Sequence, residues 1–97
     1  MLGMSTNCDI LKPCRLSAAL ISPPPHGHNG YNLKAVANML EEHGYSIRVI
    51  TNRILIVVNK NGLESSIYPS GKILIKTRNI NKARKECMTI RGIVDGI

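Results

Sequence analysis

Runs of β-prone residues, in the first of which apolar and polar side chains alternate with a period of two, predict five β-strands in this chain. The first predicted strand extends from Cys14 to Ile21, and the others lie at residues 45–51, 53–59, 63–68 and 72–77. The segment 53–59 is apolar on both sides. We therefore expect one of its faces to pack against helices and the other to be hidden or to bind a partner.

Two segments repeat their apolar residues with the 3.6-residue period of an amphipathic helix. The first begins after Asn32, a good N-cap residue, and ends at Gly44, which suits the C′ position. The second begins near Asn79 or Asn81, either of which can cap it. The two apolar stripes are Leu33, Val36, Ala37 and Leu40, then Ile80, Ala83, Cys87, Ile90 and Val94, with Lys82, Arg84, Lys85 and Arg91 off the second stripe. The predicted order of elements is β-α-β-β-β-β-α.

Turn-forming residues mark where the chain reverses between the predicted strands. Pro69-Ser70-Gly71 suits positions two to four of a type I turn. Asn59-Lys60-Asn61-Gly62 predicts a second tight turn, and residues 22–30, with three consecutive prolines, predict a loop. Residues 1–9 have no periodicity, so we expect a loose arm there and a single domain over residues 10–97.

The stretch Ile67-Tyr68-Pro69-Ser70-Gly71-Lys72 is followed by a short apolar strand, a polar N-cap and a helix. This succession resembles the second half of each repeat in the TATA-box-binding protein family, and Asn32-Leu33-Lys34 adds support at the start of the first helix. The resemblance is to a single repeat, of an archaeal type, and covers roughly residues 14 to 95. It implies an α+β fold, in which a curved five-stranded antiparallel sheet carries two helices on one face.

The same resemblance implies a binding face, because the family lays the concave side of its sheet on the DNA minor groove. Tyr68 stands where the family has an aromatic residue wedged between base steps. Arg15 replaces a groove-reading Asn, and Thr51-Asn52-Arg53 replaces a Phe-Pro-Gly kink. The candidate nucleic-acid-binding residues are Arg15, Ser17, Arg53, Tyr68, Leu74 and Lys76, joined on the predicted concave face by Leu55, Val57 and Ser66.

In the TATA-box-binding protein family, two similar repeats together form a saddle. A chain with a single repeat therefore needs a second copy to complete a saddle. Its first strand is an edge, and a long uncharged edge invites pairing with another chain. We therefore expect a homodimer along Arg15 to Ile21, with Ser17 and Ala19 near the two-fold axis.

The predicted core lies on the other side of the sheet, under both helical stripes. The strand residues expected there are Leu16, Ala18, Ile54, Ile56 and Ile75. Replacing Ile56 by Ala should then cost about 2–5 kcal/mol.

The charge of the chain bears on its partner. Among 97 residues, 13 are Lys or Arg and six are Asp or Glu, which gives a formal net charge of +7 and favours an anionic partner such as DNA or RNA. The alternative is that Leu55, Val57 and Leu74 are buried in a protein contact. The chain is then an interaction or assembly subunit that does not bind nucleic acid, and both alternatives remain open.

Residues with catalytic or metal-binding chemistry are sparse. The acidic residues are scattered and no glycine-rich phosphate loop follows a strand, so we expect neither catalysis nor a cofactor. Cys8, Cys14, His26 and His28 precede the first helix, but their spacing fits zinc poorly, and we expect no metal. Three cysteines at unrelated spacings indicate reduced thiols in a cytoplasmic protein, with Cys87 a core residue. No run is apolar enough to span a membrane, and the N-terminus lacks the layout of a signal peptide.

Overall fold

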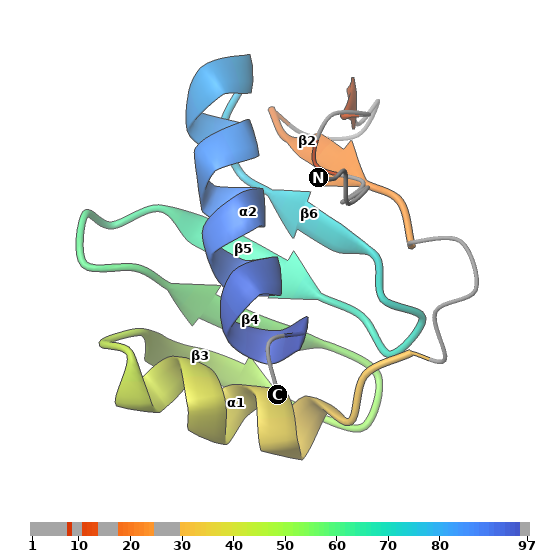
Figure 1. Cartoon of the computed structure of the whole chain (residues 1–97), viewed down its shortest axis with the longest axis vertical. Coiled ribbons are helices and arrows are strands. Elements are labelled where there is room, and N and C mark those ends of the chain that lie inside the picture. Colours follow the sequence, from red (N-terminus) through yellow and green to blue (C-terminus); the bar gives the residue numbers. More distant parts are fainter. Residues whose placement is uncertain (1–7, 9–10, 14–17, 25–29, 96–97) are drawn as a thin grey trace.

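The computed structural model describes Cys8 and residues 11–13, 18–24 and 30–95. The chain forms one sheet and two helices (Figure 1). The strands are β1 (Lys12–Pro13), β2 (Leu20–Ser22), β3 (Ser46–Ile50), β4 (Leu55–Val58), β5 (Glu64–Ile67) and β6 (Ile73–Ile75), and the helices are α1 (Leu33–Glu42) and α2 (Ile80–Asp95).

All neighbouring strands of the sheet are antiparallel, in the order β1-β2-β6-β5-β4-β3. Both helices lie on one face of the sheet, with α2 crossing its strands and α1 lying beside β3 (Figure 1). The predicted α+β class and antiparallel sheet are therefore confirmed. The expected number of strands is wrong by one, because the two-residue β1 adds a sixth strand beyond β2.

The position of β2 overturns the expectation that the first long strand is a free edge. Leu20 and Ile21 pair on one side with β1 and on the other with β6. An edge-to-edge dimer at these two residues would need β1 to be displaced. Residues 14–17, which include Arg15 and Ser17 of the expected interface, lie outside the described residues.

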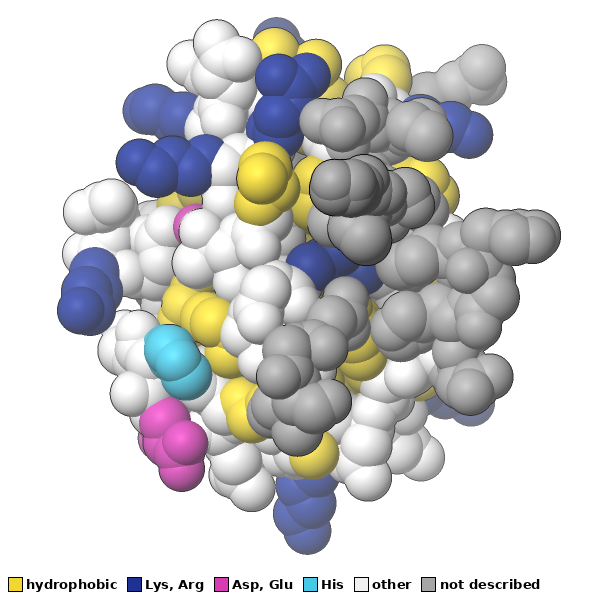
Figure 2. All heavy atoms as spheres, viewed as in Figure 1, with side chains coloured by type: hydrophobic (Ala, Val, Ile, Leu, Met, Phe, Trp, Pro, Cys, Tyr) yellow, Lys and Arg dark blue, Asp and Glu magenta, His cyan; other side chains and the backbone are white. Residues whose placement is uncertain are grey.

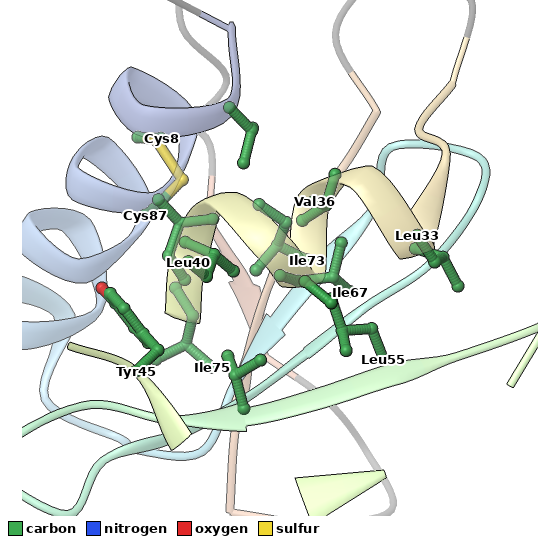
Figure 3. Packing of buried hydrophobic residues seen from close by; sticks show 14 of the residues in the cluster. Cys8, Leu33, Val36, Leu40, Tyr45, Leu55, Ile67, Ile73, Ile75 and Cys87 are labelled. Atoms are coloured by element: carbon green, nitrogen blue, oxygen red, sulfur yellow. A yellow bond between two sulfur atoms is a disulfide. The ribbon is translucent and has the colours of Figure 1, made fainter. Parts of the chain in front are cut away.

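The core fills the space between the sheet and the helices (Figure 3). Asn32 caps α1 as predicted, since its Oδ1 accepts hydrogen bonds from the backbone N–H groups of Lys34 and Ala35. The predicted stripe of α1 is buried, and so is that of α2 apart from Ile80, which is 48% exposed. The strand residues of the core are Leu20, Leu55, Val57, Ile67, Ile73 and Ile75.

These core residues show that the wrong side of β4 was predicted to face the helices. Leu55 and Val57 are completely buried under the helices, whereas Ile56 alternates with them and points to the other side of the sheet. The large loss of stability expected for Ile56→Ala assumed a core position that Ile56 does not occupy. Ile75 is buried as predicted, Ala18 is exposed, and Leu16 is outside the described residues.

Two turns of the same construction set the register of the sheet. In the turn after β5, the N–H of Gly71 donates to the carbonyl oxygen of Tyr68 (2.9 Å) and the N–H of Tyr68 donates to that of Lys72 (3.0 Å). Gly71 has φ +100°, a left-handed conformation that only glycine adopts without strain. The turn after β4 repeats this pattern from Asn59 to Leu63. The predicted reversals at Pro69 and at Asn59 are both present.

A disulfide joins Cys8 to Cys87 on α2, and both residues are completely buried in the core (Figure 3). The expectation of reduced thiols is therefore wrong for this pair, although Cys87 is a core residue as predicted. The two residues are 79 positions apart, and nothing in their local spacing indicates that they meet. The segment expected to be a loose arm is thus fixed at Cys8. Residues 1–7 and 9–10 lie outside the described part of the chain.

Candidate functional site

The sheet face away from the helices carries a row of four aliphatic side chains with one serine in its middle. Antiparallel partners share a face, and the register pairs Ile21 with Leu74, Leu74 with Ser66, Ser66 with Ile56, and Ile56 with Val49. The row crosses five strands and spans about 19 Å at the usual strand separation. We call it the open-face row: Ile21, Leu74, Ser66, Ile56 and Val49.

Side chains of the row are partly exposed, apart from Ser66, which is 5% exposed between its two aliphatic neighbours. Val49, at the β3 end, is 41% exposed. Four branched aliphatic residues thus form a partly exposed surface on the side of the sheet that neither helix covers. Such a surface is typical of a contact with another apolar surface rather than of a solvated face.

Charged side chains flank the two ends of β5 on the same face. At one end, Lys76 forms an ion pair with Glu64 (3.2 Å). At the other end, the ammonium group of Lys72 lies 4.3 Å from the centre of the Tyr68 ring, a cation–π contact. The face therefore has an apolar middle, one neutralised pair at one end and one net positive charge at the other.

The structure brings together three of the six candidate residues. Tyr68, Leu74 and Lys76 lie on the open face as expected from their alternation with buried Ile67, Ile73 and Ile75. Arg53 is exposed in the turn between β3 and β4, where its N–H donates to Thr51 Oγ1 (3.0 Å). Arg15 and Ser17 are outside the described residues.

Sequence reasoning missed the contributions of β4 and β2 to this face. It placed Leu55 and Val57 beside Ser66, but the residue paired with Ser66 is Ile56. The signal that identifies Ile56 is the turn at Asn59-Gly62. Once Asn59 is paired with Leu63 across that turn, each earlier residue of β4 has a determined partner in β5.

Most of the basic residues lie away from the open face. Figure 2 views the helix side and shows Lys and Arg side chains gathered beside the N-terminal half of α2, with others around the rim. The basic residues on or next to the helices or in the turn after β4 are Lys34, Lys60, Arg78, Lys82, Arg84, Lys85 and Arg91. The net charge of the chain is therefore not concentrated where the resemblance implies DNA contact.

A buried polar network joins α2 to the sheet below those basic residues. The hydroxyl of Tyr45 donates to Glu86 Oε2 (2.7 Å), and the side-chain amide of Asn59 donates to Glu86 Oε1 (3.0 Å). Burial, together with the hydrogen bond to Glu86 and its negative charge, raises the pKa of the Tyr45 phenol well above its usual value near 10.

The raised pKa of Tyr45 predicts a loss of stability in alkaline solution. An unfolded tyrosine ionises near pH 10, whereas folded Tyr45 stays neutral there, so its contribution is complete below pH 10 and is lost as the pH rises toward the folded value. Urea denaturation about one unit below and about one unit above pH 10 should show this decrease, and Tyr45→Phe should reduce it. Equal pH dependence in the two proteins would contradict the assignment.

A second buried network is centred on Arg91 of α2, which is 2% exposed. Its Nη2 donates to Ser22 Oγ (2.9 Å) and to the carbonyl oxygens of Gly71 (3.0 Å) and Pro23 (3.2 Å), and its Nη1 donates to the hydroxyl of Tyr31 (2.9 Å). Within the described residues, no carboxylate lies within ion-pair distance of this guanidinium. Arg91 therefore joins the second strand, the loop before α1 and the Pro69-Gly71 turn to the last helix.

The described residues contain no group of three His, Cys, Asp or Glu side chains that could hold a metal ion, and Cys8 is already bonded to Cys87. Cys14, His26 and His28 are outside the described part.

None of the helices described is both long enough and apolar enough to cross a bilayer. Comparisons with protein-family models, with curated proteins and with solved structures give no match for this chain.

Proposed function

We propose that this chain is a protein-interaction module that associates with a second copy of itself through the open face of its sheet. The observation that carries the proposal is the open-face row, which presents four branched aliphatic side chains over five strands. Burial of apolar area is worth about 25 cal/mol per Å², so covering the partly exposed side chains of this row favours association.

Charge placement supports a two-fold arrangement. Glu64 and Lys72 lie at opposite ends of β5 on the same face. When two copies meet face to face with their β5 strands antiparallel, the Glu64–Lys76 ion pair of each copy lies near Lys72 of the other, so the two net positive ends are kept apart. The contact is then apolar in its middle and brings no like charges together.

The arrangement of strands and helices supports a second, more specific part of this proposal. It is that the domain is related to one repeat of the TATA-box-binding protein family. The strand order β2-β6-β5-β4-β3, with both helices on one side, leaves a single open face of the kind that such a repeat uses for contact. A homodimer through the faces, rather than along β2, leaves the pairing of β1 with β2 intact.

Nucleic-acid binding through the same face is the second candidate. It is favoured by the Tyr68–Lys72 contact and by Lys76 and Arg53 at the borders of the face. It ranks second because Lys76 is neutralised by Glu64 and the middle of the row has no charge to meet a phosphate.

Sedimentation equilibrium tests the self-association. The wild-type protein should dimerise reversibly, and Ile56→Lys should weaken the dimer by about a hundredfold or more, because it buries an unpaired charge in the contact. Ile80→Lys is the matched control, since Ile80 is an exposed isoleucine on α2, and it should leave the dimer unchanged.

Three outcomes would count against the proposal. The first is a wild-type protein that stays monomeric throughout the concentration range, and the second is equal weakening by Ile80→Lys and Ile56→Lys. The third is specific, salt-dependent binding of duplex DNA or RNA that Arg53→Ala and Tyr68→Ala both weaken, which would favour the second candidate.

A further inference from the structure

A cavity of about 570 Å³ lies between the turn after β4 and the N-terminal half of α2. Lysines from two elements line it, Lys82 and Lys85 from α2 and Lys76 from the segment after β6, together with the amide side chain of Asn61. We propose that this cavity binds a phosphate group. None of the residues that line it belongs to the open-face row, although Lys76 also borders the open face, where it pairs with Glu64. The proposal does not depend on the proposed dimer.

Lys82 and Lys85 supply the positive charge of the site. They are three residues apart on α2, so their side chains emerge from the same side of the helix. Both are exposed, and in the described part of the chain neither has a carboxylate within ion-pair distance. Lys76 differs from them, because its ammonium group is already paired with Glu64 (3.2 Å).

Glu86 is the acidic residue in the lining of the cavity, and its position argues against a cation as the ligand. Its side chain is buried, and its two oxygens accept hydrogen bonds from Tyr45 and Asn59. Glu86 therefore forms part of the floor, fastened to the sheet. The exposed charged groups of the cavity are lysines, which attract an anion.

The composition of the cavity indicates a phosphate rather than a nucleobase or an apolar ligand. Among the described residues that line it none is aromatic, so they offer no stacking surface. Ammonium groups bind phosphate as point charges with rotatable donors, and an amide such as that of Asn61 adds a neutral donor. The volume lies in the range of small-molecule sites, so the cavity can hold the phosphates of a phosphorylated compound or of a nucleic-acid backbone.

Titration of the ¹⁵N-labelled protein with orthophosphate and then pyrophosphate, followed by NMR at constant ionic strength, tests the site. The amide signals of residues 59–63 and 82–89 should shift together. Lys85→Gln, and separately Lys82→Gln, should each weaken binding about tenfold, because each removes a charge-assisted hydrogen bond. Lys34→Gln is the matched control: it removes the same charge from an exposed position on α1 and should change affinity less than about twofold.

Two results would overturn the proposal. One is equal weakening by Lys34→Gln and Lys85→Gln, which would mean a general attraction to the charge of the protein. The other is the absence of shifts at residues 59–63 and 82–89 with both anions.

A short DNA duplex and a nucleoside triphosphate then distinguish the two sources of the phosphate. If the duplex shifts the same signals and pyrophosphate displaces it, the cavity takes a backbone phosphate. If only the triphosphate shifts them, the cavity takes a small phosphorylated compound. Either result supports the phosphate site, and neither involves Ile56, so the dimer is tested separately.

Discussion

Replacing Cys8 by alanine should lower the free energy of unfolding by about 4 kcal/mol, as expected for a cross-link between residues this far apart in sequence. The Cys8–Cys87 disulfide closes a loop whose ends are 79 positions apart, and it restricts the unfolded chain far more than the folded one. It also holds the N-terminal segment against α2, where both sulfur atoms are buried. Equilibrium denaturation in urea, with circular dichroism as the signal, measures the loss.

Reductant provides the control for the disulfide. Adding a dithiol should destabilise the wild-type protein by a similar amount and leave Cys8→Ala unaffected, because the variant has no Cys8–Cys87 bond to break. Alkylation under denaturing conditions should count two more reactive thiols after reduction of the wild type than before it. A wild-type stability that does not respond to reductant would contradict a structural role for the bond.

Replacing Arg91 by alanine should cost about 3–5 kcal/mol, since the substitution opens a cavity in the core and leaves buried acceptors without a donor. The carbonyl oxygen of Gly71 is one such acceptor, and Ser22 and Tyr31 each lose a hydrogen bond as well. The loss should appear in the midpoint of urea denaturation at an unchanged slope.

Arg91→Met separates the two contributions to this loss. Methionine fills most of the volume and removes the charge, and a buried guanidinium without a carboxylate carries a large desolvation cost. The Met variant should therefore lose clearly less stability than the Ala variant. A loss of under about 1 kcal/mol in Arg91→Ala would show that the network contributes little to stability.

Local patterns predicted the elements well because local chemistry determines them. Asn32 starts α1 by capping it, and Gly44 ends it with a left-handed backbone conformation. Pro69 and Gly71 likewise form a turn within a few residues. The α+β class and the antiparallel sheet follow from those boundaries.

The open face was predicted only in part, because both sides of β4 are apolar. In the segment 53–58, alternation cannot tell which residues point to the helices, and Ile56 was therefore assigned to the core in place of Leu55. Pairing across the turn after Asn59 resolves the choice, since it places Ile56 opposite Ser66.

The disulfide and the buried Arg91 could not be predicted, since each depends on contacts between distant parts of the chain. Cys8 and Cys87 have no shared local pattern. Arg91 is four residues after Cys87 and three before Val94, so its position falls on the buried face of α2, but a stripe defined by apolar residues leaves out an arginine. Its burial depends on carbonyl and hydroxyl groups from β2, from the loop before α1 and from the Pro69-Gly71 turn, which only the complete fold brings together.

The position of β2 also has a consequence for the order in which the protein is assembled. Strands β3 to β6 follow one another as consecutive hairpins and form from contacts between neighbours in sequence. Strand β2 precedes these four strands in the chain, yet among them it pairs with β6, the last one. It is held in place by Arg91 and lies beside the disulfide at Cys87. During synthesis on the ribosome, β2 emerges before β3 to β6 but cannot complete its contacts until α2 has followed. Strand β2 is therefore made before the four hairpin strands but joins the sheet after them.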